Sequence, residues 1–140
     1  MFTYKRRVTF YETDGMKVVH HANYLKYMEE ARVEYLRRGG LDLNDLMDEG
    51  IVFPIVKVSV KYHKPAHYDD VLLIETYLRR VDRVRLDFDY EIRLESTGDL
   101  LTTGHTVNTY TKVDTGRIAR LPKEQIAALE KVSEEDRKNG

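Results

Sequence analysis

Residues 11–24 concentrate side chains that could do chemistry on a carbonyl group. The segment reads YETDGMKVVHHANY and carries a carboxylate at Asp14, imidazoles at His20 and His21, and a phenol at Tyr24. An aspartate can activate a water molecule or attack a carbonyl carbon directly to form a mixed anhydride. If an activated carbonyl group such as a thioester is bound beside this segment, Asp14 is the candidate general base or nucleophile.

A helix predicted to start near Ala22 supplies the electrostatic part of this chemistry. Apolar and aromatic residues recur at three- and four-residue spacing over residues 23–38, and Gly39-Gly40 ends the run. The first N–H groups of a helix have no intrahelical partner, and the helix dipole favours negative charge beside them. The backbone near His21 is thus a candidate oxyanion site.

Each of these residues also has a structural interpretation. Aspartate before glycine is common in turns and caps, so Asp14 in isolation is more often a turn residue than a catalytic one. His20 and His21 could be one packed and one exposed histidine at a helix start. Glu29-Glu30 could face a partner chain as a base, although such a pair is more often a solvated helix face. No dense set of metal ligands exists, so no metal site is expected.

Composition sets the broad class of protein. The 140 residues, 41% of them apolar, fit one domain spanning residues 1–140. The 23 basic and 24 acidic residues nearly cancel, which does not indicate a nucleic-acid partner. No apolar run is long enough for a membrane-spanning helix or a signal peptide. Because cysteine is absent, which fits a reducing compartment, we expect a cytoplasmic protein.

The hydrophobic pattern predicts an α+β fold in which the long helix lies on an antiparallel sheet. Residues 3–12 are expected to form a strand that leads into the Asp14 loop, and residues 41–49 a short helix. Apolar and polar residues then alternate, with turns at Gly98 and Gly116, which predicts strands over residues 56–62, 71–79, 84–94 and 100–113.

A helix is expected to follow the predicted sheet at the carboxyl end. Pro122 opens a carboxyl-terminal helix, and residues 134–140 are expected to fray as a charged tail.

One helix covers only part of a sheet of this size. We therefore expect two chains to join their sheets edge to edge and so remove unpaired strand edges.

Spaced motifs make the chain resemble a known family. Arg7-Val8, Thr13-Asp14, the run from Val18 to Tyr24 and Glu29-Glu30-Ala31-Arg32 together resemble the active-site segment of the 4-hydroxybenzoyl-CoA thioesterase-like group of the hotdog superfamily. Weaker landmarks extend the resemblance downstream as far as Pro122.

The resemblance implies a hotdog fold, a homodimer or homotetramer, and hydrolysis of an acyl-CoA thioester without a metal or other cofactor. It places the catalytic carboxylate on Asp14 and the oxyanion-binding N–H near His21, whose side chain would orient the loop or the substrate. For substrate contacts we add Tyr24 and, as cations that could meet the CoA phosphates, Lys17, Lys61 and Arg117.

One departure from the family pattern falls on Lys17, where the family commonly has glycine. A non-glycine residue at positive φ is disfavoured, so we expect Gly15 to absorb the bend or the loop to be rebuilt. Two alternatives stay open. One is a hydratase or dehydratase of acyl thioesters, whose usual Asp-to-His spacing differs from that of Asp14 and His21. The other is an acyl-CoA binding or scaffold protein without catalysis.

Overall fold

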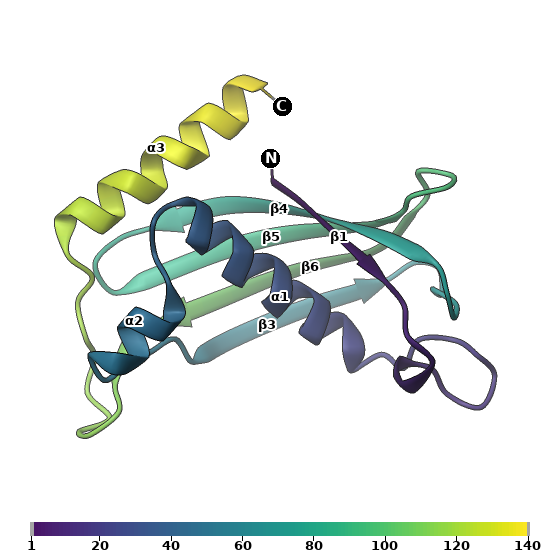
Figure 1. The fold of residues 1–140 in the computed structure, drawn as a ribbon, viewed down its shortest axis with the longest axis horizontal. Coiled ribbons are helices and arrows are strands. Elements are labelled where there is room, and N and C mark those ends of the chain that lie inside the picture. The colour runs from purple at the N-terminus through teal and green to yellow at the C-terminus, as the bar shows by residue number, and fades with distance from the viewer. Residues whose placement is uncertain (1, 140) are drawn as a thin grey trace.

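The computed structural model describes residues 2–139, in which an antiparallel sheet carries one long helix on its concave face (Figure 1). The α+β class predicted from the sequence is therefore correct. In chain order the elements are β1 (Phe2–Arg7), the 3-10 turn η1 (Phe10–Glu12), α1 (Asn23–Arg38), α2 (Leu43–Asp48), β2 (Ile51–Val52), β3 (Ile55–Tyr62), β4 (Val71–Val81), β5 (Arg85–Leu94), β6 (Leu100–Thr109), β7 (Thr111–Lys112) and α3 (Lys123–Asn139).

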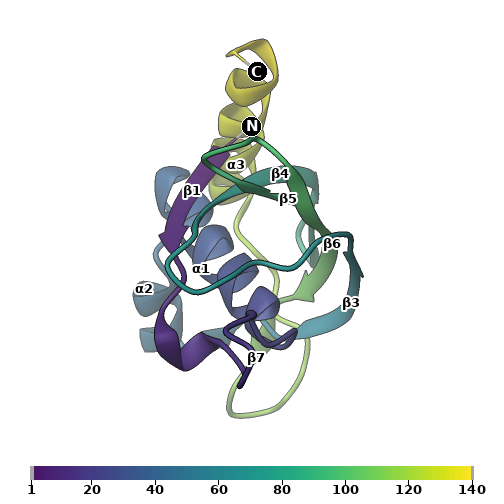
Figure 2. The same cartoon turned by 90° about the vertical axis from the view of Figure 1, so that its right-hand side faces the viewer.

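The main sheet has the strand order β1-β4-β5-β6-β3, with every neighbouring pair antiparallel. The strands β2 and β7 form a separate small ladder. Figure 2 shows the main sheet curving around α1, with β1 and β3 at its two edges. The edge strand β3 keeps four large hydrophobic side chains exposed, at Ile55, Val56, Val58 and Tyr62.

Helix α1 has the bounds that its sequence pattern predicts. Its buried face contains residues at the predicted spacing, among them Tyr24, Met28 and Tyr35. Burial of side chains of this size stabilises the fold by about 1.5–3 kcal/mol each. The Tyr35 ring meets Phe88 of β5 edge to face, with centroids 5.3 Å apart, which fixes the helix over the centre of the sheet.

Strand β1 is shorter than predicted, because the chain turns after Arg7. The expectation of strand up to Glu12 was wrong: Phe10–Glu12 form the single turn η1. The Thr9 N–H donates a 2.8 Å hydrogen bond to Glu12 Oε1, which is one half of a capping box. This local bond competes successfully with the strand propensity of the aromatic residues between them.

Helix α3 is longer than predicted. The tail expected to fray from residue 134 is helical as far as Asn139, and residue 140 lies outside the described residues. The Arg38 guanidinium donates hydrogen bonds of 3.1 and 2.9 Å to the two carboxylate oxygens of Asp136, which ties α3 to the end of α1. Over residues 2–139 no helix combines the length and the apolar character needed to cross a bilayer.

The Met28 side chain of α1 packs directly over Gly104 of β6. A Cβ on Gly104 would overlap Met28 Cε and lie 2.8 Å from Met28 Sδ, and Met28 is fully buried. We predict that Gly104→Ala lowers the free energy of unfolding by about 1–3 kcal/mol, because the core must open to admit the methyl group. Urea denaturation measures this.

The matched control is Gly15→Ala, since a Cβ there has no heavy atom within 4 Å and its φ lies outside the left-handed region. This variant is expected to unfold at the same urea concentration as the wild type or at a slightly higher one. Equal stability of the two variants would show that Gly104 is not needed for the helix to pack.

Candidate active site

Asp14 lies in a tight loop between η1 and α1. The Asp14 N–H donates to Val18 O at 2.8 Å, and the Lys17 N–H donates to Asp14 O at 3.0 Å, so the loop closes on itself. Asp14 Oδ1 accepts hydrogen bonds from the Met16 and Val18 N–H groups, at 2.8 and 3.4 Å. Within residues 2–139, Asp14 Oδ2 has no hydrogen-bond partner. The loop therefore orients one carboxylate oxygen and leaves the other exposed.

The bend of this loop falls on Lys17, whose φ is +63°. The expectation that Gly15 absorbs the bend was wrong, since Gly15 is not at positive φ. A left-handed backbone costs a residue with a side chain about 1–2 kcal/mol. The Tyr68 N–H donates to Lys17 O at 3.0 Å and helps to hold this conformation. The chain thus keeps the bend at the position where the family has glycine.

His21 lies immediately before α1 and leaves its backbone N–H unpaired. The N–H groups that follow have acceptors, because Ala22 N–H donates to His20 Nδ1 and Asn23 N–H donates to His20 O, at 3.3 and 2.9 Å. In the described part of the chain no acceptor meets the His21 N–H. The start of α1 therefore presents a free donor where the helix dipole favours negative charge.

A cavity of about 280 Å³ opens beside this donor. Tyr24 is buried in its wall, where the Tyr24 hydroxyl accepts a 3.2 Å hydrogen bond from the Ala66 N–H and the ring packs against Tyr62. The Tyr62 hydroxyl in turn donates to His21 O at 3.2 Å. The lining residues are Val18, Val19, His21, Tyr24, Tyr62, His63, Lys64 and Pro65.

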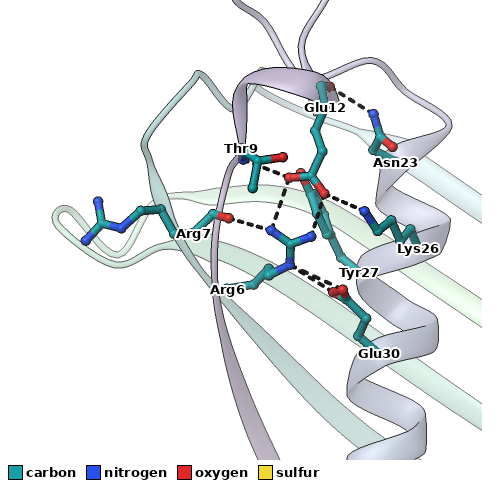
Figure 3. A network of polar contacts seen from close by, with 8 residues as sticks. All are labelled: Arg6, Arg7, Thr9, Glu12, Asn23, Lys26, Tyr27 and Glu30. Atoms are coloured by element: carbon teal, nitrogen blue, oxygen red, sulfur yellow. Dashed lines mark hydrogen bonds and ion pairs between the residues drawn. The ribbon is translucent and has the colours of Figure 1, made fainter.

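Glu12 is a buried carboxylate that joins β1, η1 and α1 (Figure 3). Its side chain accepts hydrogen bonds from Arg6 at 2.6 and 3.2 Å, from Lys26 at 3.0 Å and from the Tyr27 hydroxyl at 3.0 Å. Burial raises the pKa of Glu12, but the hydrogen bonds from Thr9 N–H, Lys26 and Tyr27 and the charge of Arg6 outweigh it and lower the pKa to about 2.

The backbone of Glu12 holds both ends of the Asp14 loop together. Glu12 O accepts hydrogen bonds from the His20 N–H at 2.9 Å and from Asn23 Nδ2 at 2.8 Å. The loop between residues 12 and 20 is therefore closed at its base, directly under the start of α1. Sequence reasoning missed this residue by placing it in a strand, although the Thr9-x-x-Glu12 spacing is the sequence signal of a capping box.

The two adjacent glutamates of α1, Glu29 and Glu30, differ in their contacts. Glu30 is engaged, because Arg6 Nε donates to both of its carboxylate oxygens at 3.0 and 3.3 Å. Glu29 is exposed and lies outside ion-pair distance of every cation in residues 2–139. Over the same residues, no three side chains of the metal-binding types gather closely enough to hold an ion.

Two predicted substrate contacts lie apart from this cavity within one chain. Lys61 neighbours Val60, which is paired with the helix-facing Gly104, so Lys61 points to the opposite face of the sheet, where it lines another cavity with Arg79 and His105. Arg117 flanks β7, because Arg117 O accepts a 2.8 Å hydrogen bond from the Lys112 N–H, and β7 pairs with β2, which follows α2 in the chain. Of the other predicted site residues, His21 and Tyr24 line this cavity, and Asp14 and Lys17 lie on the loop whose next residue, Val18, lines it.

Residues 8–129 match the sequence profile of the Thioesterase-like superfamily. The chain belongs to this superfamily. The family resemblance stated from the sequence is thereby confirmed, and the class of enzyme expected from it, a thioester hydrolase, is that of the family. The helix wrapped by a curved antiparallel sheet is the hotdog fold that its structural neighbours share.

This chain aligns with named relatives over almost the full length of each relative. It is 32% identical over 131 residues to acyl-CoA thioesterase YbgC of Haemophilus influenzae, covering 91% of this chain and 93% of the relative. It is 30% identical over 129 residues to 1,4-dihydroxy-2-naphthoyl-CoA hydrolase of Synechocystis, covering 91% and 94%. The crystal structure of DHNA-CoA thioesterase from Staphylococcus aureus superimposes with a TM-score of 0.89 at 30% identity, covering 99% and 94%.

The lowered pKa of Glu12 makes stability depend on pH. The pKa of Glu12 falls from 4.5 to about 2 on folding. The resulting stabilisation is therefore present above about pH 5 and is lost as the pH falls from about 5 to about 2. We predict that Glu12→Gln lowers the free energy of unfolding at neutral pH by at most about 3 kcal/mol. The difference in the free energy of unfolding between the wild type and Glu12→Gln should shrink as the pH is lowered from about 5 to about 3.

Denaturation curves measured across this pH range test the assignment. The control is Glu95→Gln, which removes the carboxylate of an exposed pair with Lys5 and should change stability little at any pH. A pH-independent loss in Glu12→Gln would mean that the ionised carboxylate is not what stabilises the loop base.

Proposed function

We propose that this chain hydrolyses an acyl-CoA thioester at the junction of the Asp14 loop and α1. The observation that carries the proposal is the unpaired His21 N–H, which borders a cavity and follows a loop whose aspartate has one unpaired oxygen. A thioester carbonyl oxygen bound to this N–H would be polarised, because the donor and the helix dipole both stabilise developing negative charge.

Asp14 Oδ2 then has two routes to the thioester carbon. It can accept a proton from a water molecule that attacks the carbonyl, or it can attack directly to form a mixed anhydride that water hydrolyses. In both routes the C–S bond breaks and CoA leaves as the thiolate, which takes a proton from water. The His21 N–H would hold the oxyanion throughout, and the His21 side chain, which stacks on His20, would help to orient the loop.

The names of the relatives support an acyl-CoA substrate over other thioesters, since both curated relatives and the superimposed structure are named for acyl-CoA hydrolysis. For the CoA phosphates, Lys17 is the predicted cation on the same loop as Asp14. Lys61 and Arg117 would require a second copy of the chain to approach this site. The hydratase and the non-catalytic binder remain the alternatives to be separated by experiment.

We also propose that the working unit contains two chains paired along β3. This strand is a sheet edge, and its exposed apolar side chains leave a row that a second copy would cover. Asp14 is exposed in the single chain, and exclusion of water would strengthen the electrostatic interactions of the site. A homodimer or homotetramer would thus complete the candidate site.

Asp14→Asn tests the catalytic assignment. Asparagine keeps the oxygen that accepts from the loop N–H groups but cannot act as base or nucleophile, so we predict a loss of about 100-fold or more in kcat with an unchanged fold. The measurement follows free thiol release from a panel of acyl-CoAs, with circular dichroism as the fold check. Asp48→Asn, an exposed aspartate on α2, is the matched control and should keep wild-type activity.

The same panel separates the alternatives. Near-normal thiol release by Asp14→Asn would remove Asp14 from the mechanism. Tight acyl-CoA binding without thiol release by the wild type would favour the binding protein, and a change in enoyl absorbance without thiol release would favour the hydratase.

Lysine on the edge strand tests the proposed pairing. We predict that Val56→Lys or Val58→Lys shifts the chain to monomers and lowers hydrolysis, because lysine on a sheet edge opposes strand pairing between chains. Light scattering coupled to gel filtration gives the mass. Val113→Lys, an equally exposed valine after β7, should assemble like the wild type. A monomeric and fully active wild type would contradict the pairing.

A further inference from the structure

Arg32 of α1 is a buried cation without a counterion. Its exposed fraction is 6%, and its only hydrogen bond in residues 2–139 is from Nη1 to the neutral Tyr90 hydroxyl, at 3.2 Å. The Tyr90 hydroxyl is shared with Thr106 Oγ1 at 2.8 Å. Within the described residues, no carboxylate lies within ion-pair distance of Arg32.

Two other arginines at this helix each have a carboxylate partner. Arg6 pairs with Glu12 and Glu30, and Arg38 pairs with Asp136. Arginine remains charged in proteins, and removing its charge from water without an anionic partner is strongly unfavourable. The guanidinium of Arg32 therefore has unused capacity to bind an anion.

A cavity of about 150 Å³ lies beside Arg32, between α1, α2 and the segment that joins β2 to β3. Apart from Arg32 and Glu29 its walls are apolar, and Glu29 is exposed and does not reach Arg32. The lining residues are Glu29, Arg32, Val33, Leu36, Leu43, Met47, Val52 and Phe53. An apolar chamber with one buried guanidinium suits an apolar chain that ends in a carboxylate.

A second polar group with unmet capacity belongs to the same region. Asn108 Oδ1 is buried and has no hydrogen-bond donor, while Asn108 Nδ2 donates to Phe53 O at 3.0 Å, and Phe53 lines the cavity. Asn108 follows Thr106 by two residues on β6, so both face α1. A water molecule that donates to Asn108 Oδ1 and to a ligand carboxylate held by Arg32 would satisfy both groups.

We propose that Arg32 binds a carboxylate at the far end of the acyl group, so that the preferred substrates are elongated ω-carboxyacyl-CoA thioesters. The inference rests on the proposed function, which places the thioester at His21. Arg32 lies nine residues after the first residue of α1, about 13 Å along the helix axis at 1.5 Å per residue. An acyl group that joins the two points is therefore extended, with a carboxylate at the end opposite the thioester.

Hydrolysis kinetics provide the first test. The panel pairs adipoyl-, suberyl-, sebacoyl- and dodecanedioyl-CoA with hexanoyl-, octanoyl-, decanoyl- and dodecanoyl-CoA. The wild type should prefer the best carboxylated substrate over its neutral match by about 10-fold or more in kcat/KM. Arg32→Met should bring the ratio of kcat/KM between each carboxylated substrate and its neutral match to about one, because methionine fills similar space without charge.

Two further variants sharpen the kinetic test. Arg32→Lys retains the positive charge and should retain part of the preference, which also decides the matter if Arg32→Met does not fold. Arg37→Met, on the same helix but exposed and paired with Glu34, is the matched control and should keep the full preference. Equal kcat/KM for carboxylated and neutral substrates in the wild type would overturn the proposal.

Ligand binding without chemistry separates failure of this inference from failure of the proposed function. Sebacate and decanoate, which are both apolar chains that end in a carboxylate, should raise the melting temperature of the wild type and of Arg37→Met and should leave Arg32→Met unchanged, whereas the neutral 1-decanol should raise none of them. This outcome would support the anion site even if no thioester is hydrolysed. If neither test shows selectivity and Arg32→Met changes the mass of the oligomer, the counterion of Arg32 comes from a second copy, and the proposal is wrong.

Discussion

The charge of one buried carboxylate organises the candidate site. Glu12 lies where the first strand ends, and its side chain collects donors from that strand, from its own turn and from α1. Because a buried carboxylate is costly to desolvate, its donors must all be present at once. The first strand, the turn and the helix are thereby held in one arrangement, and the Asp14 loop, whose two ends meet at the Glu12 carbonyl, inherits that arrangement.

The helix α1 links this arrangement to everything the site is proposed to do. Its amino-terminal end offers an N–H donor beside one cavity, and its buried Arg32 faces a second cavity further along. Its close approach to the sheet depends on the missing side chain of Gly104. The helix α1 therefore sets the distance between the donor at its start and Arg32, while Asp14 reaches the same end of the helix from the adjoining loop.

The sequence predicts local features of this protein well and non-local ones poorly. The bounds of α1 follow from its apolar spacing and from Gly39-Gly40, and His21 and Tyr24 line one cavity because they are close in the chain. The faces of Lys61 and Arg117 depend on strand register and on a small ladder between distant segments, which no local pattern specifies. Arg32 was missed for the same reason, since burial of its charge is visible only once the sheet has closed over it, whereas Glu12 had a local signal in its capping-box spacing from Thr9.

The Asp14 loop and its flanks are held against a segment that lies 47 to 62 residues further along the chain. Val8 N–H donates to Asp70 O, Val19 N–H donates to Ala66 O, and Tyr68 N–H donates to Lys17 O. Contacts of such sequence separation form late, because the entropy of closing the intervening chain must be lost first. During synthesis, the loop thus cannot take its final shape until the segment around Asp70 has left the ribosome. Assembly of the site is expected to coincide with the closing of the sheet, and not with the earlier formation of its helix.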